Sequence, residues 1–104
     1  MKTVPLEMVT DASGNGLIQF TARKPAVIYT IHKISTVMPV ITTGWVEVYK
    51  NGAFQSKMNI ALRMEAYGPE TLFTSEHIQV RMFAGPASTV IQFLFFYDES
   101  AGLP

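Results

Sequence analysis

Apolar and polar residues alternate along most of this 104-residue chain, and its last long run breaks the alternation. Residues 88–97 read Ser-Thr-Val-Ile-Gln-Phe-Leu-Phe-Phe-Tyr, so positions of both parities are apolar and Gln92 is the single interruption. A β-strand points successive side chains to opposite faces, so this strand must be covered on both sides. The chain's own core supplies one cover, and in so small a domain we expect the second from another subunit or a docking surface. One face holds Thr89, Ile91, Phe93, Phe95 and Tyr97, and the other holds Val90, Leu94 and Phe96.

Short β-like runs bounded by turn residues make up the rest of the chain. They predict strands at residues 3–10, 17–22, 26–38, 45–50, 53–56, 71–74 and 76–83, the last being the expected partner of residues 88–97. Residues 59–67 suit a strand by alternation and a helix by composition, and we choose the strand. About eight short strands without a convincing helix predict one all-β domain over residues 1–104, a sandwich or barrel. We favour an antiparallel, jelly-roll-like β-sandwich.

Three local signals refine these strands. Pro5 lacks an amide hydrogen, which places the first strand at a sheet edge. Asn51-Gly52 separates two β-like runs and predicts a hairpin, because both residues accept the positive φ of a type I′ turn. Within residues 26–38 the apolar parity changes near His32-Lys33, and a β-bulge there would explain the change.

Composition narrows the classes of partner. Eight basic and eight acidic side chains leave no net charge, so we expect neither nucleic acid nor a membrane as a partner. Only 15% of residues are charged against 48% hydrophobic, which favours self-association. The chain has no cysteine, and its start lacks an apolar stretch of signal-peptide length. We therefore expect a protein made in the cytoplasm that forms oligomers.

Residues able to carry catalytic chemistry are scattered. His32 and His77 lie far apart and have no neighbouring ligands at metal-binding spacing, so structural roles explain them better. Glu47 and Glu65 each occupy an alternating polar position of a β-like run, where a solvated face is a simpler explanation than a catalytic pair. We expect a protein that is not an enzyme and needs no cofactor or metal.

Two aromatic residues are candidates for a binding surface. Trp45 and Tyr49 share one face of their strand, opposite Val46 and Val48. If that face is exposed, the pair could contact a sugar or a protein partner, since each ring joins apolar area to a hydrogen-bonding tip. If it is buried, the pair simply fills the second face of a sandwich core.

Several motifs resemble, in order, those of the C1q and tumour-necrosis-factor superfamily of trimeric jelly rolls. They are Gly16, Phe20-Thr21-Ala22, Pro25, Tyr29, Tyr49-Lys50-Asn51-Gly52, Leu72 with Ser75-Glu76, Val80, and Ser88-Thr89 through Phe93-Leu94 to Tyr97. The resemblance covers roughly residues 14–97. It implies a homotrimer whose last strand has one face in the subunit core and the other near the three-fold axis.

This resemblance sets the expected function. A module of this kind without a signal peptide, cysteine or collagen-like stalk looks like the small β-sandwich proteins of bacteriophage particles, namely capsid decoration proteins and fibre heads. The expected location is the virion, and the expected partners are copies of the chain and a major capsid or fibre protein. Its alternative is a carbohydrate-binding module that uses Trp45 and Tyr49. The residues expected in the core or the subunit interface are Tyr29, Phe93, Phe95 and Tyr97.

Overall fold

The computed structural model describes residues 2–34, 44–59 and 69–99, and these form an all-β fold. No helix occurs in these three ranges. Eight strands pair antiparallel throughout, which confirms the predicted fold class. The strands are β1 (Lys2–Val9), β2 (Gly16–Thr21), β3 (Ala26–Ile34), β4 (Trp45–Lys50), β5 (Ala53–Asn59), β6 (Glu70–Leu72), β7 (His77–Phe83) and β8 (Val90–Glu99).

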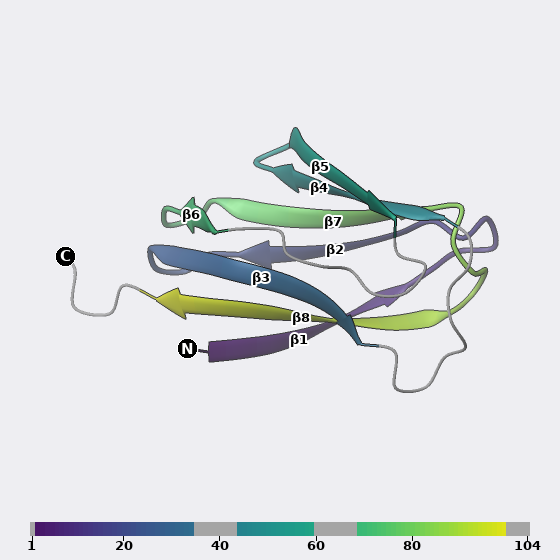
Figure 1. Ribbon diagram of the computed structural model, residues 1–104, viewed down its shortest axis with the longest axis horizontal. Coiled ribbons are helices and arrows are strands. Elements are labelled where there is room, and N and C mark those ends of the chain that lie inside the picture. The colour runs from purple at the N-terminus through teal and green to yellow at the C-terminus, as the bar shows by residue number, and fades with distance from the viewer. Residues whose placement is uncertain (1, 35–43, 60–68, 100–104) are drawn as a thin grey trace.

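Two four-stranded sheets form the layers of a sandwich (Figure 1). Sheet A has the order β1-β8-β3-β6, and sheet B has the order β2-β7-β4-β5. Successive strands lie in opposite sheets except in the β4–β5 hairpin, which is a jelly-roll-like topology. The expected pairing of residues 76–83 with residues 88–97 is wrong, because β8 pairs with β1 and β3 while β7 belongs to the other sheet. Apart from β4 and β5, strands that follow one another in sequence therefore lie in different sheets instead of sharing hydrogen bonds.

The core lies between the sheets and includes one of the two apolar faces of β8. Phe93 and Phe95 are fully buried, and Phe20 of β2 stacks on Phe95 with ring centroids 5.5 Å apart. Tyr97 meets Phe20 edge-on at 5.0 Å, so one aromatic cluster joins the two sheets. The buried cluster consists of Met8, Ile18, Ala22, Ala26, Ile28, Ile31, Val46, Val48, Leu72, Ile78, Val80, Met82, Ile91, Phe93 and Phe95.

Two of the local signals are confirmed. Pro5 lies in β1, which is the edge strand of sheet A and pairs with β8 alone. Asn51 and Gly52 have φ values of 50° and 84° and connect Lys50 to its register partner Ala53. A hairpin closed by two residues with positive φ is the predicted turn.

The third signal is placed wrongly, because the bulge in β3 lies at Tyr29 and not near His32-Lys33. The register with β8 shifts between Ile28 and Thr30, so Tyr29 is the extra residue. This insertion lets Ile28 and Ile31 both point into the core while Tyr29 stays outside, 42% exposed. The expected strand over residues 59–67 falls outside the described residues after Asn59, as does the end of the run 26–38.

Candidate functional surfaces

The outer face of sheet A carries apolar side chains that no described strand covers. We call it the sheet A face. Leu94 and Phe96 lie at its centre on β8 and are partly buried between the flanking strands. Val9 and Val90 are register partners at one end, 66% and 51% exposed. The face comprises Pro5, Val9, Val27, Tyr29, Thr30, Val90, Gln92, Leu94 and Phe96, with Thr3, Glu7 and Asp98.

Of the four residues expected in the core or the subunit interface, three lie in or against the core and one lies on the sheet A face. Phe93 and Phe95 belong to the core, and Tyr97 packs against it. Tyr29 lies on the sheet A face, where its hydroxyl donates a hydrogen bond of 2.9 Å to an Asp98 carboxylate oxygen. This bond raises the pKa of Tyr29 above its ordinary value. On the sheet A face, Tyr29 is therefore exposed, as Val90 at the start of β8 is.

Thr30 is an unusual polar group on this face. Its hydroxyl oxygen is buried and has no hydrogen-bond partner among the described residues. A buried hydroxyl without a partner opposes folding, because it loses its bonds to water and gains nothing in return.

The outer face of sheet B is built from aromatic and polar side chains on all four strands, and we call it the sheet B face. Trp45, Glu47 and Tyr49 point outward from β4, while Val46 and Val48 are fully buried. The structure thus places the candidate pair outside the core, which is one of the two alternatives that the sequence left open. The other members are Leu17, Gln19, Thr21, Phe54, Lys57, His77, Gln79, Arg81 and Phe83.

Glu47 lies between the two candidate aromatics and binds both. The Trp45 indole nitrogen donates to one carboxylate oxygen at 2.9 Å, and the Tyr49 hydroxyl donates to the other at 2.6 Å. The Tyr49 bond, followed by the Trp45 bond, lowers the pKa of the Glu47 carboxyl, and the same contact raises the pKa of Tyr49. The polar tips of both aromatics are therefore already occupied.

The ring faces of both aromatics are flanked as well. Trp45 stacks on Phe83 of β7 with centroids 5.6 Å apart, and Lys57 of β5 lies 4.7 Å above the Trp45 ring. Since β7 and β5 lie on opposite sides of β4, the indole stands between these two neighbours. Tyr49 has Arg81 over its ring at 3.9 Å and an edge contact with Phe54 at 5.8 Å. Trp45 and Tyr49 therefore present ring edges rather than a flat platform.

Polar bonds continue from this aromatic group across sheet B. Arg81 donates through Nε and Nη2 to the Gln79 side-chain oxygen, at 3.2 and 2.8 Å. Gln79 in turn donates to Gln19, and Gln19 to Thr21, each at 2.9 Å. The chain of bonds fixes the Arg81 guanidinium beside the ring of Tyr49.

A shallow depression of about 300 Å³ opens where β2 and β7 meet the preceding loop. Asp11 and Asn15 lie at its rim, and Leu17, Arg81 and Phe83 line it from the strands. Reasoning from the sequence missed this site, because the Asp-Ala-Ser-Gly-Asn-Gly stretch signals only a turn. The pairing of β2 with β7 brings that loop beside Arg81 and Phe83.

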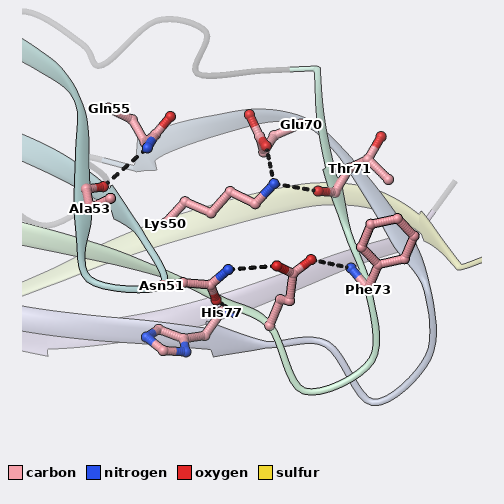
Figure 2. A network of polar contacts seen from close by, with 9 residues as sticks. Lys50, Asn51, Ala53, Gln55, Glu70, Thr71, Phe73 and His77 are labelled. Atoms are coloured by element: carbon pink, nitrogen blue, oxygen red, sulfur yellow. Dashed lines mark hydrogen bonds and ion pairs between the residues drawn. The ribbon is translucent and has the colours of Figure 1, made fainter.

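A second polar network ties the β4–β5 hairpin to the opposite sheet (Figure 2). Lys50 donates to a Glu70 carboxylate oxygen at 2.6 Å and to the Thr71 carbonyl at 3.0 Å, which links sheet B to β6 of sheet A. The Asn51 side-chain amide donates to the Glu76 carboxylate at 2.6 Å. The Phe73 amide donates to that carboxylate at 2.7 Å and, with Asn51, lowers the pKa of Glu76. These bonds belong to one end of the sandwich and serve to hold its two layers together.

Other classes of site find no support in the described ranges. Residues 2–34, 44–59 and 69–99 bring together no three histidine, cysteine, aspartate or glutamate side chains that could hold a metal ion. The same ranges contain no helix with the length and apolar character needed to cross a membrane. No family model matches the chain, and no curated protein matches it significantly.

Proposed function

We infer that this protein is a non-enzymatic structural module that assembles as a homotrimer through the sheet A face, as a capsid decoration protein or fibre head of a bacteriophage. One observation carries the assembly: β8 is apolar on both faces, and its outer face begins with Val90, which is 51% exposed beside Val9, itself 66% exposed. β8 lies between β1 and β3, so this apolar surface is at the middle of a sheet.

Burial of this face is favourable for a simple reason. Removing apolar area from water contributes about 25 cal/mol for each Å² before the costs of association are subtracted. The carboxylates of Glu7 and Asp98 on this face oppose its complete burial. The hydrogen bonds that they accept, from Gln92 at 3.1 Å and from Tyr29, offset this cost only in part. With no net charge on the chain, copies do not repel one another strongly.

The trimeric state and the virion rest on the resemblance to C1q and tumour-necrosis-factor modules. The jelly-roll-like strand order is the topology which that resemblance implies, and the last strand lies inside a sheet, between β1 and β3. A shared fold does not specify a function, so the virion role remains a proposal to be tested directly.

Assembly is tested by light scattering after size-exclusion chromatography. We expect the wild-type chain to have the mass of three protomers, and Leu94→Glu to give a folded monomer because a charge would be buried in the contact. Leu17→Glu is the matched control, since Leu17 is 53% exposed on the opposite, sheet B face. The control should remain trimeric.

Two outcomes would oppose the assembly proposal. One is a wild-type chain that is monomeric at micromolar concentration. The other is a folded Leu94→Glu variant with the same mass as the wild type. The virion role is checked separately by mass spectrometry of purified particles from cultures that express the chain, and absence of its peptides from the particles would contradict that role.

A carbohydrate-binding module is the second candidate function. The observation that favours it is the outward position of Trp45 and Tyr49 on the sheet B face, which is separate from the sheet A face. Binding there is compatible with assembly through sheet A. A shift of Trp45 fluorescence on addition of an oligosaccharide tests this candidate.

A further inference from the structure

The depression beside Phe83 has the chemistry of a sugar site, and we propose that it binds one pyranose ring of a glycan. The proposal goes beyond the assembly function and gives the carbohydrate-binding candidate a location other than the rings of Trp45 and Tyr49. Aromatic, cationic, anionic and amide side chains converge here on a surface outside the sheet A face. Concave surfaces that combine an apolar wall with a few polar groups are the usual form of ligand sites.

Phe83 supplies the apolar wall. Trp45 of β4 stacks on one side of its ring. In sheet B, β4 and β2 flank β7 on opposite sides, so the other side of Phe83 borders the depression next to β2. Leu17 of β2 lies at the same depression and is 53% exposed. An aromatic ring backed by a second ring offers a rigid surface to the C–H face of a pyranose.

Polar groups at the rim provide both donors and acceptors. Arg81 lines the depression, and its guanidinium, which donates to Gln79 through Nε and Nη2, places a positive charge beside it. Asp11 accepts the amides of Ser13 and Asn15 through Oδ1 alone, at 2.8 and 3.0 Å. The second oxygen of Asp11 is therefore available to accept a hydroxyl. The Asn15 side chain accepts the Ala84 amide at 3.2 Å, and its NH₂ group remains free to donate among the described residues. Neighbouring hydroxyls, each a donor and an acceptor, match this mixed set.

The loop that carries Asp11 and Asn15 is held in place by backbone bonds. The Asp11 amide donates to the Asn15 carbonyl, and the Asp11 carbonyl accepts the Ser88 amide, each at 2.9 Å. The Gly14 carbonyl accepts the Gly85 amide at 2.9 Å. Gly14 has a φ of 79°, and a Cβ at this position would lie 2.0 Å from the Gly85 oxygen. The rim is thus positioned before a ligand arrives, which reduces the entropy lost on binding.

The size and charge of the site favour a single sugar over other ligands. A depression of about 300 Å³ holds a small ligand. The one cation is offset by Asp11, and the whole chain has no net charge, so a nucleic acid or another polyanion gains little here. A shallow site of this kind binds one ring weakly, with a Kd on the order of millimolar.

The test is an NMR titration of the full chain with methyl glycosides of glucose, galactose, mannose and N-acetylglucosamine and with N-acetylneuraminic acid. We expect saturable amide shifts for at least one of these sugars at Leu17, Arg81 and Phe83, without shifts on β1 or β3. Phe83→Leu should weaken binding at least about tenfold, because it removes the ring and keeps an apolar side chain. Phe54→Leu is the matched control on the same face, outside the depression, and should bind as the wild type does.

Three results would overturn the proposal. They are the absence of shifts at about ten times the expected Kd for every sugar tried, equal binding by Phe83→Leu and wild type, and shifts confined to residues around Phe54 and Tyr49. The last would leave carbohydrate binding in place at another part of the sheet B face. None of the three bears on the mass of the oligomer, so this proposal and the assembly proposal fail independently.

Discussion

Replacing Thr30 by valine should stabilise the protein, although Thr30 lies in β3 as the register partner of Phe96. Its hydroxyl oxygen is buried and lacks a partner among the described residues, whereas in the unfolded chain it is hydrated. A buried polar group without a bond costs about 1–3 kcal/mol. Valine has nearly the same shape and suits a β-strand as well as threonine does, so Thr30→Val should raise the free energy of unfolding by about 1 kcal/mol or more.

The same substitution at Thr10 should instead lower the free energy of unfolding. Thr10 is 3% exposed, and its hydroxyl donates to the Pro86 carbonyl at 2.6 Å and accepts the Thr89 amide at 2.8 Å. Thr10→Val leaves both backbone groups without this partner, and we expect a loss of about 2 kcal/mol. Both variants replace a hydroxyl by a methyl group. The difference between their effects on stability therefore reports whether the hydroxyl has a hydrogen-bond partner.

Urea unfolding followed by Trp45 fluorescence measures both values. All variants must be compared at one protomer concentration, because the stability of an oligomer depends on concentration. A Thr30→Val variant less stable than the wild type would refute the reasoning, since it would show that the hydroxyl is bonded in solution. Equal effects at Thr30 and Thr10 would refute it too.

The remaining predictions concern a glycine and a carboxylate. Gly14→Ala should lower the free energy of unfolding by at least about 2 kcal/mol, because φ is positive there and the new Cβ would meet Gly85. Gly52→Ala should lower it by only about 1 kcal/mol, because φ is positive but the space around the Cβ is open. Thermal unfolding measures both losses, and equal losses would contradict this prediction. Tyr49→Phe removes the main cause of the lowered Glu47 pKa, so its deficit in stability should be full above pH 4.5 and shrink as pH falls through the folded pKa. Urea midpoints across pH 2.5–7 measure that deficit, and one that does not change with pH would argue against the bond.

Local pattern determined much of the fold. Alternation along a strand puts Phe93 and Phe95 on one face of β8 and Trp45 and Tyr49 on one face of β4, which needs only backbone geometry. The Asn51-Gly52 hairpin followed from the φ values these two residues accept. In each case the cause lies within a few residues of sequence, so the sequence was sufficient to predict the result.

Tertiary structure alone decided which strands are neighbours. Residues 76–83 and 88–97 are adjacent in sequence and lie in different sheets, and the bulge at Tyr29 depends on what each isoleucine of β3 meets in the core. The candidate sugar site also required this information, since Asp11 and Phe83 become neighbours only when β2 pairs with β7. Pairing between distant segments is governed by the packing of the whole sandwich, and a single sequence contains no local signal for it.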